Sequence, residues 1–131
     1  MSTTLTPSLM FIGKASEAID RYTSIFDDAE LVRITRYDAS NPEMEGQIMQ
    51  AELRLQNQSL LLTDSPDMHS FTFTPSVSFF VRCESVEEVD RIFAALSEDG
   101  TVMMPLDAYP FNARFGWCND RFGVSWQVGL N

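Results

Sequence analysis

Apolar and polar positions in the first part of the chain follow the patterns of strands and of an amphipathic helix. An apolar run at 8–12 has the length of a buried strand, and Gly13 follows it as a breaker. From Glu17 to about Phe26, apolar residues recur at three- and four-residue steps, which predicts an amphipathic helix capped by Ser16. The remaining predicted elements are strands at 31–37, 47–55 and 59–63, with an exposed loop at 38–46 and a hairpin turn at 56–58.

The second part of the chain repeats this order. A strand is predicted at 77–81, followed by a helix from Val86 to Leu96. Ser85 is its expected cap, Glu88 the partner in a capping box, and Gly100 ends the helical region. The remaining predicted elements are strands at 102–106, 115–118 and 124–128, and a mobile lid at 107–114.

The two parts are similar in sequence as well as in order. Glu87, Asp90 and Arg91 each lie 70 residues after Glu17, Asp20 and Arg21. Coincidence between two amphipathic helices is the alternative explanation. A unit of one strand, one helix and three strands cannot bury both its helix and the concave side of its sheet, so two units must pair. We therefore predict a single domain, 1–131, with half-units at approximately 1–64 and 75–131 and a linker at 65–74.

Short motifs along the whole chain carry a family likeness, and the C-terminal ones are the most specific. They are 6–11 (TPSLMF), Ala15, Glu17, Ala18, Tyr22, 85–91, 104–106, 115–117 (FGW) and 120–126 (DRFGVSW). With the duplication, they resemble the vicinal oxygen chelate superfamily of glyoxalase I, bleomycin-resistance proteins and extradiol dioxygenases. Within it the chain looks most like the PhnB-like group, whose domain is labelled 3-demethylubiquinone-9 3-methyltransferase. The resemblance implies an α+β fold in which two tandem βαβββ units form a curved mixed sheet around a cavity.

The resemblance also implies a divalent metal held by His or Glu side chains from four strands. Carried onto this chain, the ligand positions fall near Pro7 or Ser8, near Leu61, near Ser76 or Val77, and at Gln127. None of these windows contains His, Glu or Cys, and Asp64 is the nearest carboxylate. We therefore expect no metal. No glycine-rich phosphate loop or nucleotide-binding fingerprint occurs either, so no cofactor is predicted.

Inward-facing strand residues would line the implied cavity with apolar, aromatic and a few polar groups, as in small-molecule pockets. The predicted ligand-binding residues are Arg114, Gln127, Trp117, Tyr109, Asp64, Ser76, Arg54 and Phe73. An arginine fork would take an anionic group, and Trp or Tyr would stack on a planar one. No catalytic residue is predicted: the lone His69 is expected in an exposed loop, and Cys118 as a buried, inert thiol.

The amino-acid composition excludes some classes of binding partner. The net charge of -10 disfavours nucleic acid and anionic membranes, and the apolar runs are far shorter than the ~20 residues that span a bilayer. Two cysteines without an export signal favour a reducing cytoplasm. We expect a cytoplasmic homodimer that binds or sequesters a small molecule. The alternatives are a metal-dependent lyase, isomerase or dioxygenase using Asp64, Gln127 or His69, a metal-free enzyme using Arg114 or Asp64, and a structural dimer without ligand.

Overall fold

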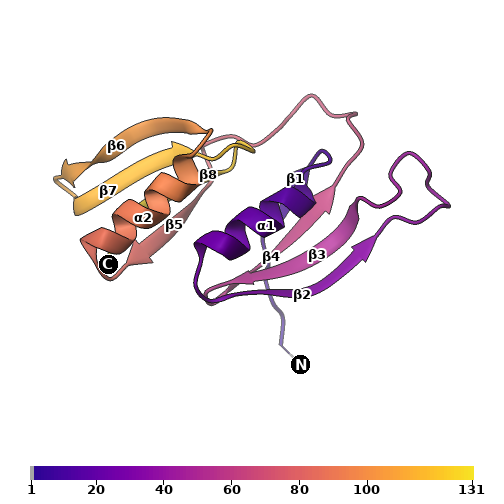
Figure 1. The fold of residues 1–131 in the computed structure, drawn as a ribbon, viewed down its shortest axis with the longest axis horizontal. Helices are drawn as coiled ribbons and strands as arrows, with labels where there is room; N and C mark the ends of the chain where they lie inside the picture. The colour runs from indigo at the N-terminus through magenta and orange to yellow at the C-terminus, as the bar shows by residue number, and fades with distance from the viewer. Residues whose placement is uncertain (1) are drawn as a thin grey trace. The chain divides into compact units, whose positions relative to one another are not determined.

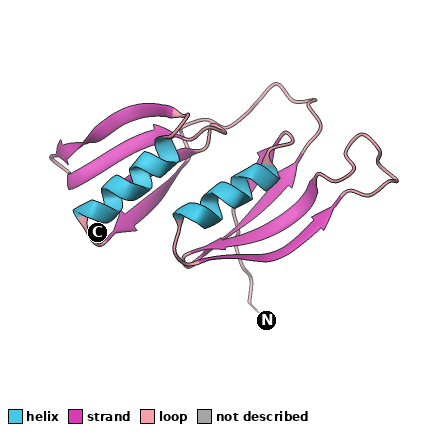
Figure 2. Ribbon diagram, viewed as in Figure 1, coloured by secondary structure: helices cyan, strands magenta, loops and turns pink. Residues whose placement is uncertain are grey.

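The structure is a computed structural model that describes residues 2–131. It contains two compact units, the first ending at His69 and the second beginning at Ser70. Each unit has the chain order βαβββ (Figure 2), which confirms the predicted α+β duplication. The elements are β1 (Ser8–Phe11), α1 (Ala15–Ile25), β2 (Ala29–Arg36), β3 (Ile48–Leu55), β4 (Gln58–Asp64), β5 (Ser78–Cys83), α2 (Val86–Ser97), β6 (Thr101–Tyr109), β7 (Asn112–Asn119) and β8 (Ser125–Leu130). Neither described helix has the length and apolar character needed to cross a bilayer.

The two sheets have the same topology (Figure 1). The first sheet has the order β1-β4-β3-β2, and the second has the order β5-β8-β7-β6. In each, the first strand runs parallel to the last, and the other neighbours are antiparallel. Each helix packs on one face of the sheet of its own unit, so the opposite face carries no helix of that unit.

The start of α1 differs from the prediction. The helix begins at Ala15 rather than Glu17, and its N-cap, Lys14, makes no side-chain hydrogen bond. Ser16 therefore lies inside the first turn and does not cap the helix. Instead, the backbone N–H of Ala15 donates to Oδ1 of Asp64 at 3.0 Å. A carboxylate from the end of β4 thus replaces the local cap, at the helix end where the dipole favours negative charge.

The start of α2 follows its local sequence. The hydroxyl of Ser85 accepts a hydrogen bond from the N–H of Glu88 at 3.1 Å. The carboxylate of Glu88 in turn accepts from the N–H of Glu84 at 3.0 Å. The predicted cap is therefore confirmed, with the return bond made one residue earlier than in the standard capping box.

Two glycines let backbone segments of the second unit approach closely. A Cβ on Gly100 would lie 2.1 Å from the carbonyl oxygen of Asn119, so the chain after α2 can reach β7 only without a side chain there. A Cβ on Gly116 would lie 2.6 Å from the ring of Phe93, which shows that α2 packs directly on β7 at this residue. The left-handed conformation after α2 falls on Asp99, with φ 60°, rather than on Gly100.

The segment 107–114, expected as a mobile lid, belongs to a β-hairpin. β6 runs to Tyr109 and β7 begins at Asn112. The predicted end of this strand at Pro105 is wrong because β6 is an edge strand, where a missing backbone N–H is tolerated. The hydroxyl of Tyr109 donates to the carbonyl of Pro105 at 2.7 Å, and the rings of Tyr109 and Phe111 stack at 5.6 Å. These contacts order the tip that composition alone assigns to a loop.

Candidate functional site

One face of the second sheet gathers aromatic side chains. Strand pairing places Phe80, Gln127 and Trp117 in one row across β5, β8 and β7. Neighbours in such a row project to the same face of a sheet. Gly116 lies against Phe93 of α2, so Trp117, the next residue, points away from the helix. We call this side the open face of the second sheet. It includes Ser78, Phe80, Arg82, Tyr109, Phe111, Phe115, Trp117, Ser125 and Gln127, and strand pairing adds Met104, Asp107 and Asn119.

Four rings of the open face form an aromatic cluster around Phe115. The ring centroids of Phe80, Tyr109 and Phe111 lie 5.9, 5.8 and 4.9 Å from that of Phe115. These separations lie in the favourable range for aromatic pairs. Phe115 is only 2% exposed, whereas Phe80 is 40% and Phe111 64% exposed. The cluster therefore has a buried base and two rings that still present apolar area.

Arg82 places a positive charge beside this cluster. Its guanidinium carbon lies 5.1 Å from the ring centroid of Phe80, two residues earlier on β5, in cation–π contact. Within residues 2–131, Arg82 makes no ion pair with a carboxylate. Although the chain has 19 acidic and only 9 basic residues, Arg82 contacts an aromatic ring and not a carboxylate side chain.

Polar groups lie on the same face, at the start of β5 and β8. The indole N–H of Trp117 donates to the hydroxyl of Ser125 at 2.8 Å, and that hydroxyl lies 2.7 Å from the hydroxyl of Ser78. Ser125 is 1% exposed, and Ser78 is half-buried. Either hydroxyl can donate in this bond, and when Ser125 is the donor, the hydrogen of Ser78 is available to a ligand. The half-buried amide of Gln127 lies in the adjacent row.

Three of the predicted binding residues, Trp117, Tyr109 and Gln127, lie together on the open face. Ser76 is exposed in the turn before β5, where its hydroxyl lies 2.8 Å from that of Thr74. Phe73 is half-buried earlier in the same segment. Its Cβ would lie 3.8 Å from a Cβ on Gly123, in the turn between β7 and β8.

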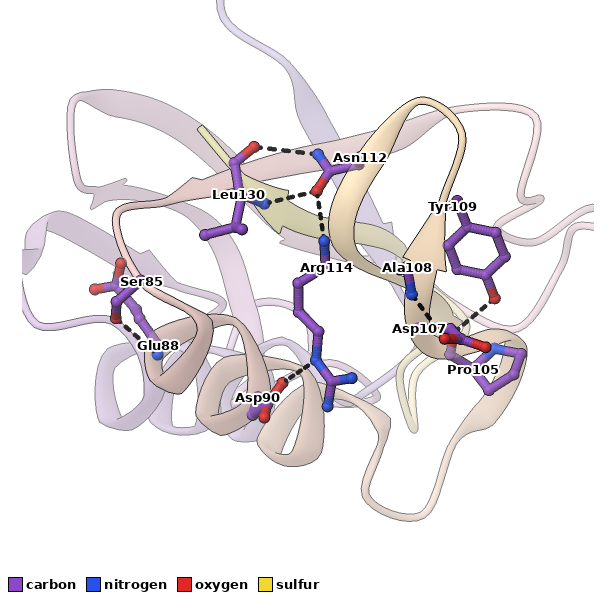
Figure 3. A network of polar contacts seen from close by, with 10 residues as sticks. All are labelled: Ser85, Glu88, Asp90, Pro105, Asp107, Ala108, Tyr109, Asn112, Arg114 and Leu130. Carbon is purple, nitrogen blue, oxygen red and sulfur yellow. Dashed lines mark hydrogen bonds and ion pairs between the residues drawn. The ribbon is translucent and has the colours of Figure 1, made fainter.

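Arg114 lies on the other side of the second sheet. Figure 3 shows its side chain extending from β7 toward Asp90 on α2, where Nε donates to Oδ1 at 2.8 Å. The hydrogen bond that Arg114 donates to the carboxylate of Asp90 raises the pKa of Arg114 above its ordinary value. Because Arg114 and Trp117 are three residues apart on one strand, alternation sends them to opposite faces. The two cannot contact one ligand on the same face of this sheet.

Arg54 and Asp64 belong to the first unit, and both are engaged there. Arg54 lies 3.1 Å from the carboxylate of Asp28 and 3.4 Å from that of Glu30. Asp64 is 3% exposed, and its second carboxylate oxygen accepts the N–H of Ile48 at 3.0 Å. With Oδ1 on the start of α1 and Oδ2 on the start of β3, Asp64 joins two elements of the first unit.

Sequence reasoning missed Phe80, Arg82 and Phe115. The signal was present on β5, where Ser78, Phe80 and Arg82 occupy alternate positions. Alternate residues of a strand share a face, so the hydroxyl of Ser78, the ring of Phe80 and the cation of Arg82 project to the same side of the sheet.

The two thiols do not contribute a nucleophile. Burial raises the pKa of the Cys83 thiol to about 11 and that of the Cys118 thiol to about 12. Both are therefore protonated at neutral pH, and the thiolate is the reactive form. The predicted buried thiol at 118 is confirmed, and His69 is exposed, as expected for a loop residue.

The residues at the superfamily's metal positions do not fit a divalent cation. Ser8 and Leu61 are direct neighbours on β1 and β4, and Gln127 lies on β8. A serine hydroxyl, a leucine side chain and an amide lack the imidazole and carboxylate donors that such metals need. Across residues 2–131, no three His, Cys, Asp or Glu side chains form a group able to hold a metal ion.

Comparison of the fold identifies the class of protein. A glyoxylase/bleomycin resistance protein/dioxygenase domain from Frankia matches with a TM-score of 0.69 at 17% identity, covering 100% of this chain and 98% of that one. The fosfomycin resistance protein FosX from Listeria monocytogenes matches with a TM-score of 0.65 at 11% identity, covering 100% of this chain and 94% of that one. The chain has the vicinal oxygen chelate fold.

Sequence comparison identifies the family within that class. The family model of 3-demethylubiquinone-9 3-methyltransferase matches residues 3–129. An uncharacterized protein of Mycobacterium bovis is 32% identical in an alignment that covers 95% of this chain and 81% of that protein. The structure of a PhnB protein from Bacillus cereus matches with a TM-score of 0.94 at 48% identity, covering 98% of this chain and 100% of that one. The chain therefore belongs to the 3-demethylubiquinone-9 3-methyltransferase family, the PhnB-like group.

The family description names methyl transfer, and the described residues lack the two common arrangements that bind a phosphate-bearing nucleotide. Both sheets are mixed and four-stranded, unlike the doubly wound parallel sheets that bind dinucleotides. Helix N-termini are the other common phosphate sites. The start of α1 is occupied by Asp64, and the start of α2 by Ser85 and Glu88.

Proposed function

We propose that the chain binds a small organic molecule on the open face of the second sheet. The observation that carries this proposal is the aromatic cluster, whose rings at Phe80 and Phe111 remain 40% and 64% exposed beside the cation of Arg82. Exposed apolar area is worth about 25 cal/mol per Å² when a ligand covers it. Apolar walls with a few placed polar groups are the usual composition of a small-molecule site.

The chemistry of the open face favours binding over turnover. Its polar groups include two hydroxyls, an indole, a phenol, two amides, a guanidinium and the carboxylate of Asp107, which pairs with Phe115. None of these has an ordinary pKa near neutrality, which is where a general acid or base works best. Cys118 lies on the side of α2, because it neighbours Trp117 on β7. Recognition and sequestration are therefore the proposed role.

A thermal-shift screen of fused-ring aromatic compounds, neutral, anionic and cationic, tests this role. A ligand at 100 times its Kd adds about 2.7 kcal/mol of stability. We expect a saturable rise in Tm that Phe80→Ala abolishes. Val86→Ala is the matched control, since Val86 is 41% exposed on α2, away from the open face. No shift with any compound, or an unchanged shift in Phe80→Ala, would contradict the proposal.

A further inference from the structure

We propose, resting on the proposed function, that the ligand is a planar aromatic acid whose carboxylate is held by Arg82. Ser78, Phe80 and Arg82 lie on the same side of β5 at alternate positions. Strand geometry separates Ser78 from Arg82 by about 13 Å, with the aromatic ring between them. A fused-ring acid lying along β5 would meet a cation at one end, rings along its length and a hydroxyl at the other end.

The immediate surroundings of Arg82 favour an acid. Several other arginines lie against carboxylates, such as Arg33 at 2.8 Å from Glu52 and Arg121 at 3.0 Å from Glu98, whereas Arg36 donates to a hydroxyl and a carbonyl. Arg82 contacts the ring of Phe80 instead. A guanidinium over a ring keeps the donors at its edge available, and their fork matches a carboxylate. The ligand would supply the anion that the chain does not.

The surrounding groups fix how the acid would lie. Phe115 is fully covered by its neighbours and forms the base, while Phe80 and Phe111 offer exposed ring area for stacking. Offset or edge-to-face contacts with these rings favour a flat ligand over a branched one. At the far end, Ser78 can donate its hydrogen, and the amide of Gln127 can donate or accept. A polar substituent opposite the carboxylate would therefore gain a partner.

Isothermal titration with naphthoate and its neutral isostere, naphthamide, tests the inference. We expect naphthoate to bind about tenfold more tightly, which corresponds to ~1.4 kcal/mol. Arg82→Gln should remove that advantage and leave the affinity for naphthamide unchanged. Arg114→Gln is the matched control, because this arginine pairs with Asp90 on the side of α2 and should change neither affinity. Higher ionic strength should weaken naphthoate binding alone.

The outcomes separate this inference from the function on which it rests. Equal affinities for the two probes, or equal losses in Arg82→Gln and Arg114→Gln, would overturn the aromatic acid. If naphthamide still binds and Phe80→Ala abolishes its binding, the open face remains a binding site for neutral aromatic molecules. If neither probe binds, the inference is wrong, and the wider thermal-shift screen decides the proposed function by itself. Because Arg82 is exposed, its substitution should leave folding intact, which circular dichroism checks.

Discussion

Replacing Asp64 by alanine should destabilise the first unit strongly. Its two carboxylate oxygens accept the N–H groups of Ala15 and Ile48, each at 3.0 Å. Both donors belong to fully buried residues, so water cannot easily replace the lost acceptor. Leaving a buried donor unpaired costs about 1–3 kcal/mol, so the two together cost about 2–6 kcal/mol. Domains of this kind have only about 5–15 kcal/mol of stability in total.

The isosteric variant Asp64→Asn refines this prediction. An amide retains one oxygen and turns its NH₂ group toward the other donor, so Asn should recover at most about half of the loss. Asp38→Ala is the matched control, since this exposed carboxylate bonds only within its own turn, to Ser40. We expect its unfolding midpoint to be unchanged.

Denaturant unfolding and amide hydrogen exchange measure the effect. The urea midpoint of Asp64→Ala should fall, and the amides of Ala15 and Ile48 should lose protection before those of α2. An unfolding free energy within about 0.5 kcal/mol of the wild type would refute the structural role of Asp64. A stable variant that lost only ligand affinity would instead restore the sequence-based prediction that Asp64 contacts the ligand.

Further predictions concern capping, packing, the thiols and assembly. Ser85→Ala should cost about 1 kcal/mol by denaturant unfolding, whereas Ser16→Ala, outside any cap, should cost under about 0.5 kcal/mol; equal costs would contradict the assigned caps. Gly116→Ala should cost about 1–3 kcal/mol because its Cβ would collide with α2, and a neutral result would refute that packing. Since burial raises the pKa of Cys83 to about 11 and of Cys118 to about 12, the unfolded chain releases these protons first, and the free energy of unfolding should fall as pH rises from 9.0 toward 11. Cys118→Ala should flatten that slope, and an unchanged slope would argue against the raised pKa. The homodimer stays a prediction that light scattering tests, with the mass of one chain contradicting it.

Local signals in the sequence predicted local structure well. Ser85 and Glu88 lie three residues apart at the start of α2, and their bonds depend only on that spacing. The cap of α1 could not be found this way, because its acceptor, Asp64, lies 49 residues away in sequence. Only the pairing of β4 beside β1 brings that carboxylate to the helix. The duplication, which depends on element order, was predictable because each unit repeats the same local patterns.

The candidate site was only partly predictable for a related reason. Trp117 and Gln127 share a face because they pair directly across β7 and β8. Both were predicted from their positions in the C-terminal motifs. Arg114 was predicted to bind the ligand together with Trp117. Three residues separate the two on β7, so their side chains project to opposite faces of the sheet. Arg82 became visible only through its contact with Phe80, since sequence alone does not say which arginines find a carboxylate.

The two tryptophans of the chain give the most direct test of binding on the open face. Trp117 lies on that face, whereas Trp126 lies on the side of α2, where its indole N–H donates to Asp120 at 2.9 Å. In a proton–nitrogen correlation spectrum titrated with naphthoate, the indole signal of Trp117 should shift in a saturable manner while that of Trp126 stays in place. Equal shifts of both signals, or a shift of Trp126 alone, would contradict the assignment of the binding site.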